Sequence, residues 1–172
     1  MKRYWLRWLS QFYICLIFVA SSSLGSATEL SDTDALKNLK EGKVIWDIGA
    51  ENPVKLALYL KVVQQTYDGL IKQNVKPDMV FAFHGGAVKL ITVEHDHADL
   101  EQHNEKAEKA EIATLLADLQ KRPGVRMEVC GIATALFKID NDRILSGIKP
   151  VGNTFISLIG YHAQGYTQIP LY

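Results

Sequence analysis

The stretch VIWDIGAENPVKLALYLKVVQQTYDGLIKQNVKPDMVFAFHGG, residues 44–86, decides the fold, because it joins two apolar runs of strand length through one amphipathic segment. Residues 44–48 are rich in β-branched and aromatic side chains, which predicts a strand. Asn52 and Pro53 follow as an N-cap and a first helical residue. Apolar side chains then recur every three or four positions, which predicts a helix with one core face: Leu56, Leu60, Val63, Tyr67 and Leu70.

The same alternation of strand and helix continues beyond this stretch. Residues 79–83 form a second apolar run, and residues 87–92 favour a short helix. A charged, histidine-bearing loop is expected over residues 93–106. Another helix follows and stops near Pro123-Gly124, and its core stripe consists of Ile112, Leu115, Leu116 and Leu119. A third strand is predicted at residues 125–129.

The last part of the chain adds two further strands. A short helix around residues 134–137 and a turn at residues 140–142 precede a fourth strand at residues 148–151. A last helix ends at a C-terminal cap formed by Gly165, and it is lined by Phe155, Leu158, Ile159 and His162. A fifth strand follows at residues 166–170. Strands that alternate with helices predict an α/β fold of three α/β/α layers, with a five-stranded, mostly parallel sheet and a flavodoxin-like architecture.

The first 27 residues have the features of a signal peptide. A basic start is followed by the apolar run Phe12–Ala20 and by small residues up to Ala27. The run has nine residues, whereas a membrane span needs about 20. We therefore expect cleavage after Ala27 and a periplasmic or secreted protein, with an uncleaved N-terminal membrane anchor as the alternative. Residues 28–42 then form a short polar leader, and residues 43–172 form a single domain.

The charge and the cysteine content of the mature protein exclude several classes of function. Cleavage removes three basic and no acidic residues, which leaves 16 basic against 19 acidic side chains, a net charge of −3. Such a domain lacks the basic surface of a nucleic-acid or anionic-lipid binder. Of the two cysteines, Cys15 lies in the signal and only Cys130 is left, so no disulfide forms within the mature chain. Glycine-rich nucleotide motifs, a Gly-x-Ser-x-Gly elbow and a Cys-x-x-Cys pair are absent from the sequence.

Cys130 is the first candidate functional residue. It follows the third predicted strand and precedes a helix, and open α/β sheets bind ligands at the carboxyl ends of their strands. The backbone N–H groups that follow, from Gly131 onward, stabilise a thiolate, which attacks sulfur or accepts a sulfane sulfur. A buried, inert cysteine fits the same position equally well, because free cysteine is among the most buried residue types.

His84-Gly85-Gly86 is the second candidate, because it ends the second predicted strand and opens on the same edge as Cys130. A histidine there donates to a bound anion or takes the proton of the thiol. The two glycines allow the backbone to approach a ligand closely. The alternative role for His84 is to cap a turn, and a single histidine favours that alternative.

The loop Glu94-His95-Asp96-His97, with Asp99 and His103 after it, is a weak candidate for metal binding. His95 and His97 share a face if the loop is extended, and Asp99 and His103 share one if it is helical. The sequence contains no His-Glu-x-x-His motif and no calcium-binding loop. A solvated charged loop is therefore the preferred interpretation, and we expect neither a metal nor another cofactor.

Four fragments, taken in order, resemble the DsrE/DsrF-like family: residues 83–88, residues 124–131, residues 144–148 and residues 164–170. The resemblance implies a three-layer α/β/α fold with a five-stranded parallel sheet. It also implies homo-oligomers, commonly trimers or hexamers. The best understood members pass sulfur through a persulfide on one cysteine, whose position matches Cys130 here.

We therefore predict an exported, homo-oligomeric protein that binds or relays sulfane sulfur on Cys130, with assistance from His84. Its partners are a small sulfur compound or a sulfur donor or acceptor protein, with no nucleic acid and, after cleavage, no membrane. One alternative is a non-catalytic module that binds a small ligand or a protein, in which Cys130 only packs. The other is a metal-binding protein that uses the histidine loop. The residues leave open whether the protein is an enzyme.

Overall fold

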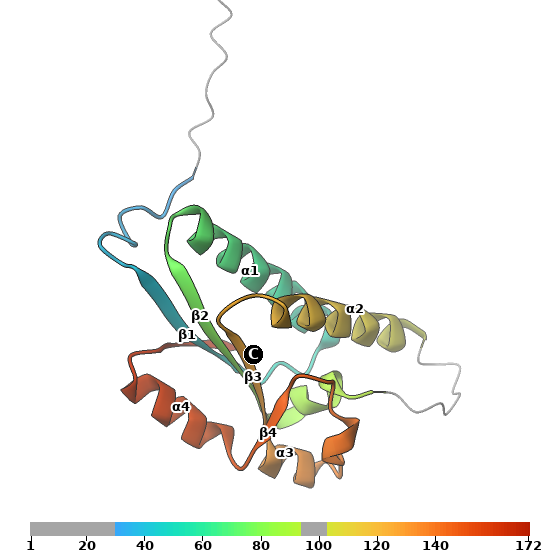
Figure 1. The fold of residues 1–172 in the computed structure, drawn as a ribbon. Coiled ribbons are helices and arrows are strands. Elements are labelled where there is room, and N and C mark those ends of the chain that lie inside the picture. Colours follow the sequence, from blue (N-terminus) through green and yellow to red (C-terminus); the bar gives the residue numbers. More distant parts are fainter. Residues whose placement is uncertain (1–29, 94–102) are drawn as a thin grey trace, which may run out of the picture. The chain divides into compact units, whose positions relative to one another are not determined.

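Five parallel strands form the central sheet of the computed structural model, which describes residues 30–93 and 103–172 (Figure 1). The strand order is β4-β3-β2-β1-β5. The predicted α/β class is therefore confirmed, and every pairing in this sheet is parallel. The strands are β1 (Glu41–Ile48), β2 (Lys76–Phe83), β3 (Val125–Cys130), β4 (Lys149–Val151) and β5 (Thr167–Leu171).

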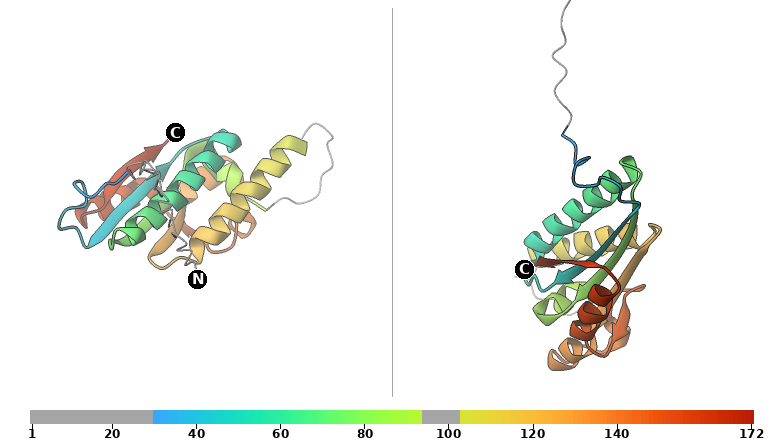
Figure 2. Two further views of the ribbon diagram at one scale, coloured as in Figure 1. Left: turned by 90° about the horizontal axis from the view of Figure 1, so that it is seen from above. Right: turned by 90° about the vertical axis from the view of Figure 1, so that its left-hand side faces the viewer.

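Helices cover both faces of this sheet. In Figure 1, α1 (Pro53–Lys72) and α2 (His103–Gln120) lie side by side over one face, and α4 (Thr154–Ala163) lies over the other. The further views of Figure 2 separate the same two layers. The short helix α3 (Gly131–Leu136) follows the carboxyl end of β3 directly, and the described residues also form two 3₁₀ helices: η1 (Gly85–Ile91) and the single-turn η3 (Asn141–Arg143).

The start of α1 follows its sequence signals. The side chain of Asn52 accepts a hydrogen bond from the backbone N–H of Lys55 at 2.9 Å, and Pro53 occupies the first helical position. This cap satisfies one of the donors that every helix start leaves free. Four residues of the predicted stripe are buried in this helix: Leu56, Leu60, Val63 and Tyr67. The fifth, Leu70, is only partly buried.

Several boundaries differ from those predicted from the sequence; strand β2, for example, begins at Lys76 rather than at Met79. Strand β1 begins at Glu41 rather than at Val44, because its first residues pair with Lys76 and Pro77 at the start of β2. Helix α2 begins at His103, within the segment expected to be a loop. Polar residues without an apolar period, as in the first turns of α2, give little signal for a helix start.

The α1/α2 face of the sheet carries the main core. Side chains of β1, β2 and β3 alternate across the sheet, so every second residue points to this face. Strand β2 contributes Met79, Phe81 and Phe83, all fully buried against apolar residues of α1 and α2. Burial of this size is the main stabilising term for a domain of this kind.

The α4 face is built differently. Its buried apolar cluster consists of five described residues: Ile45, Val80, Ala82, Leu158 and Tyr166. Of the stripe predicted for the last helix, only Leu158 is buried, whereas Phe155 is 58% exposed and Ile159 is 71% exposed. The repeat predicted along this helix therefore does not mark a buried face at Phe155, at Ile159 or at His162, which is exposed as well. Helix α4 is apolar on both sides, so periodicity alone does not identify the side that faces the sheet.

Polar contacts replace apolar burial under the other end of α4. The hydroxyl of Tyr166 donates to Asp78 at 2.7 Å and accepts a hydrogen bond from Arg126 at 2.7 Å. Arg126 also donates to Asp78 at 2.7 Å, and Tyr161 donates to Glu128 at 3.0 Å. This network joins the start of β2, strand β3 and the end of α4, so hydrogen bonds fix the helix where few apolar contacts exist.

Candidate functional site

The register of the sheet brings two predicted site residues to one edge. Phe83 of β2 pairs with Val129 of β3, and both side chains lie in the α1/α2 core. His84 and Cys130 come one residue later, so the alternation of side chains directs them toward the opposite, α4 face, and Cys130 also packs against the edge of the main apolar cluster. Neighbouring strands are about 4.8 Å apart. The two residues therefore occupy adjacent positions at the carboxyl ends of β2 and β3.

Cys130 ends β3 and caps α3, and it is only 5% exposed. Burial raises the pKa of its thiol. Hydrogen bonds from the backbone N–H groups of Thr154, Ala133 and Ile132, with a contribution from the Thr154 hydroxyl, lower it by more. The pKa of the Cys130 thiol thus falls below its ordinary value of 9.0. The starts of α3 and α4 both point N–H donors at this sulfur atom, which favours the thiolate.

Thr154 contributes a polar side chain next to the thiol. It is the first residue of α4 and is 0% exposed, yet its hydroxyl oxygen has no regular hydrogen-bond partner. The contact with Cys130 is too weak to count as a good hydrogen bond, although it is close enough to lower the pKa of the thiol. A buried hydroxyl without a partner is costly. Its donor is therefore free for an atom attached to, or lying next to, the cysteine sulfur.

Gly131, the first residue of α3, packs tightly against β4. A Cβ atom at this position would lie 2.8 Å from the carbonyl oxygen of Val151, which is closer than real Cβ atoms approach. The missing side chain thus allows β4 to reach the residue after Cys130. This close approach helps to place the start of α4, and with it Thr154, beside the thiol.

His84 is bound to a buried carboxylate that the sequence analysis did not single out. Its Nε2 atom lies 2.6 Å from Oδ1 of Asp47, which is on β1 and is 2% exposed. The other oxygen, Oδ2, accepts hydrogen bonds from Nε2 of Gln168 at 2.8 Å and from the hydroxyl of Tyr172 at 2.6 Å. The bond to Asp47, followed by burial, raises the pKa of Tyr172 to about 12.

Glycines make room for this cluster. A Cβ at Gly49 would lie 2.8 Å from the Tyr172 ring and 3.0 Å from the His84 ring. Gly85 has a φ of 54°, which favours glycine, and turns the chain from β2 into η1. At Gly86 a Cβ would overlap the carboxylate of Glu51. The loop after β2 therefore packs on the loop after β1.

Phe155 connects the two halves of the site. Its ring meets the His84 ring edge-on, with centroids 5.4 Å apart, and the preceding residue, Thr154, contacts Cys130. Between His84 and Cys130 themselves, the described side chains form no direct hydrogen bond. The structure thus places the imidazole and the thiol on neighbouring strand ends, each in contact with the start of α4.

Of the three metal candidates, only His103 lies in the described part of the chain. His95 and His97 lie outside the described residues, and His103 begins α2, on the opposite face of the sheet. Across residues 30–93 and 103–172, no group of three or more histidine, cysteine or acidic side chains is arranged to hold a metal ion. Within these same ranges, no helix combines the length and apolar character needed to cross a membrane.

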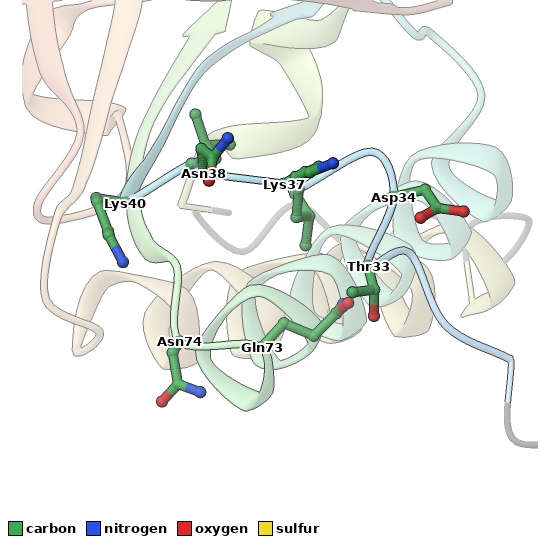
Figure 3. Close-up of a pocket in the computed structure, with 9 residues that line it drawn as sticks. Thr33, Asp34, Lys37, Asn38, Lys40, Gln73 and Asn74 are labelled. Atoms are coloured by element: carbon green, nitrogen blue, oxygen red, sulfur yellow. The ribbon is translucent and has the colours of Figure 1, made fainter.

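A surface cavity of about 520 Å³ lies far from these residues, at the amino-terminal ends of the strands. Figure 3 shows its lining, which comes from residues 33–40 before β1 and from Gln73 and Asn74 after α1. It contains none of the predicted site residues. Ligands of parallel α/β sheets bind at the carboxyl ends of the strands instead. The candidate site is therefore the edge that carries Cys130 and His84.

Fold and site define an α/β protein with one thiol at the carboxyl edge of a parallel sheet. The family model of the DsrE/DsrF-like family matches residues 47–171, and the chain belongs to this family. No curated protein matches the sequence.

Two solved structures share the fold. One is MTH1491 from Methanobacterium thermoautotrophicum, a protein of unknown function, with a TM-score of 0.57 at 14% identity over 75% of this chain and 98% of that one. The other is the YchN protein from E. coli, with a TM-score of 0.51 at 12% identity over 76% of this chain and 99% of that one. At these identities the similarity defines the fold alone.

Proposed function

We propose that this DsrE-like protein carries sulfane sulfur as a persulfide on Cys130. The observation that carries the proposal is the surroundings of the thiol: three backbone N–H donors and a fully buried hydroxyl, that of Thr154, which has no regular partner. Hydrogen-bond donors around a sulfur atom stabilise its anion. A persulfide places a second sulfur atom, also anionic, next to the same donors.

The chemistry is a transfer without net oxidation. The Cys130 thiolate attacks the outer sulfur of a donor R–S–SH, and the bond between the two donor sulfurs breaks. Cys130 then carries S–SH, and the donor leaves as the thiolate RS⁻. The reverse reaction, with an acceptor thiolate as nucleophile, passes the sulfur on. Because Cys130 is 5% exposed, a small sulfur compound, or a partner protein that presents a single sulfur atom, fits the site best.

Intact mass spectrometry tests this function. Wild type and Cys130→Ser are incubated with polysulfide, and the wild type alone is expected to gain about 32 mass units, one sulfur atom. Thr154→Val is expected to load less, whereas Thr134→Val, the same change in α3, is expected to load normally. Equal loading of Cys130→Ser would refute the proposal. A thiol that stays unmodified until the protein unfolds would favour the alternative of a binding module with a packing cysteine.

We further propose that a second copy of the chain covers the outer surface of α3 and α4. Five apolar side chains there are between 58% and 73% exposed: Ile132, Leu136, Phe155, Ile156 and Ile159. A helix that is apolar on all sides is normally buried, and the family resemblance implies homo-oligomers. Light scattering is expected to give an oligomer for wild type and for Leu58→Glu, a control on α1, and a monomer for Ile156→Glu. An oligomeric Ile156→Glu would exclude this interface.

The proposed location is outside the cytoplasm, on the basis of the signal-like residues 1–27. Sequencing the amino terminus of protein recovered from the periplasm is expected to begin at Thr28. An intact Met1 in a membrane fraction would instead support the anchored alternative.

A further inference from the structure

The Asp47 carboxylate does not contribute to the lowered pKa of Cys130. Its burial inside the protein costs free energy, because a charged group loses its contact with water. Asp47 is 2% exposed on a central strand, where a charge is tolerated only with partners. Three donors surround it: His84 on Oδ1, and Gln168 and Tyr172 on Oδ2. Two of these donors come from β5 and the residue after it, so the sheet itself holds the carboxylate in position.

This arrangement fixes the proton positions on His84. A carboxylate only accepts hydrogen bonds, so Nε2 of His84 carries hydrogen and donates to Asp47. Since Nε2 is occupied, Nδ1 is the nitrogen that exchanges protons. No side chain or backbone group in the described part of the chain is hydrogen-bonded to Nδ1. The ring is held further by the edges of Phe155 and Tyr172, with centroids 5.4 and 6.2 Å from its own.

His84 lies next to the strand end at which sulfur transfer is proposed. It follows β2 at the position next to Cys130 on β3, on the same face of the sheet. Both residues contact adjacent residues of α4, Phe155 and Thr154. A leaving group that departs from a sulfur attacked by Cys130 therefore starts at the strand end next to the one that carries this imidazole.

We propose that His84, positioned by Asp47, donates a proton to the thiolate that leaves when Cys130 takes sulfur, so that the donors are persulfides or polysulfides of aliphatic thiols. This inference rests on the proposed function, because it assigns the substrate class of the same site. The S–S bond of R–S–SH breaks, RS⁻ takes the Nδ1 proton of the imidazolium, and RSH leaves. In the return direction neutral His84 removes the proton of the acceptor thiol. Aliphatic thiolates are basic and leave slowly without a proton, whereas acidic thiols need no such help.

Disulfide exchange at Cys130 tests the proton transfer separately from sulfur loading. The probes are hydroxyethyl disulfide, whose leaving thiolate is basic, and dithiodipyridine, whose leaving group needs no proton. His84→Gln is expected to slow exchange with the aliphatic probe by about 100-fold, and to change exchange with the aromatic probe by less than about threefold. His162→Gln, the same change at an exposed histidine of α4, is expected to leave both rates unchanged.

Asp47→Asn is expected to give the same selective loss, because an amide in place of the carboxylate no longer fixes the Nε2 proton. If this variant does not fold, Tyr172→Phe, which keeps the carboxylate, serves in its place, with a smaller loss on the aliphatic probe alone. Equal slowing of both probes in His84→Gln would overturn the inference, as would no slowing of either. A wild type that exchanges with both probes but never gains sulfane sulfur would refute the proposed function, while the dependence on His84 would still be measured.

Discussion

The two faces of the sheet bury their residues in different ways. On the α1/α2 face, side chains from β1, β2 and β3 form one continuous apolar core with both long helices. On the α4 face, the described apolar cluster has five members, and the remaining area is filled by two polar groups. One joins Asp78, Arg126 and Tyr166, and the other joins Asp47 and His84.

The residues that contribute most to the stability of the fold and the residues of the candidate site therefore lie mainly on different faces of the sheet. Apolar burial on the first face stabilises the fold, and Cys130 meets this cluster at the carboxyl end of β3. The second face keeps a thiol, an imidazole and a carboxylate at the carboxyl edge of the sheet, beneath one short helix. Substitutions on the two faces are therefore expected to affect different measurements, and the following predictions test that separation.

The largest effect on stability is expected in the α1/α2 core. Leu60 of α1 is 0% exposed, so Leu60→Ala is expected to lower the free energy of unfolding by about 2–5 kcal/mol, through lost burial and a cavity. Leu58, two residues earlier, is 58% exposed, and Leu58→Ala is expected to cost less than about 0.5 kcal/mol. Urea unfolding measures both values. Similar losses at the two sites would contradict the assignment of the core face.

A smaller effect is expected from the polar network under α4. Tyr166→Phe removes a hydroxyl bound to both Asp78 and Arg126, and should cost about 1–2 kcal/mol because a half-buried charged acceptor loses a donor. Tyr59→Phe, which removes an exposed hydroxyl that donates to the Tyr172 carbonyl, should cost less than about 0.5 kcal/mol. Thermal unfolding compares the two variants. An equal cost would mean that the network contributes nothing specific.

The next prediction concerns the ionisation of Cys130. Its pKa in the folded protein lies below 9.0, so the thiolate contributes stability above that value, and the contribution is lost as the pH falls through the folded pKa. Thr154→Val removes one donor and is expected to raise the pKa of the thiol. The rate of alkylation as a function of pH measures it. Thr134→Val, which changes a hydroxyl bonded to Gly131, should leave it unchanged. Identical profiles for both variants would count against a role for Thr154.

The smallest effect on stability is expected from Tyr172. The pKa of its hydroxyl is raised from 10 to about 12, chiefly by the bond to Asp47, so its contribution is present below pH 10 and is lost as the pH rises through about 12. The side chain is more than half exposed, which weakens the effect. Ultraviolet titration of phenolate, with Tyr172→Phe as the reference, measures the value. A pKa near 10 would show that the hydroxyl does not bind Asp47 in solution.

The sheet and its edge could be predicted from the sequence because they depend on local pattern. Strand-length apolar runs, the Asn52-Pro53 cap and the glycines after the strands are all short-range signals. They were enough to place Cys130 and His84 at one edge of a parallel sheet. The last helix was harder, since Phe155 and Ile159 continue an apolar pattern that in fact faces outward.

The partners of the site residues could not be predicted. Asp47 is a charged residue within an apolar strand, which was a visible signal, but two of its three donors lie 121 and 125 residues further along the chain. Thr154 has no local signature, because its importance comes from the return of β4 to the end of β3. Contacts of this range depend on the finished topology rather than on spacing within the sequence.

The position of β1 between β2 and β5 has a consequence for the order of assembly. One hydrogen-bonding edge of this apolar strand stays open until Thr167–Leu171 reaches it, and an open edge is prone to pair with other chains. The same late strand supplies Gln168, which helps to neutralise Asp47. Without these residues, the unpaired edge of β1 is exposed and the Asp47 carboxylate lacks one of its hydrogen-bond donors. The domain is therefore complete only when β5 has paired with β1. The pairing of β5 with β1, rather than early helix formation, would then set the time at which this domain becomes native.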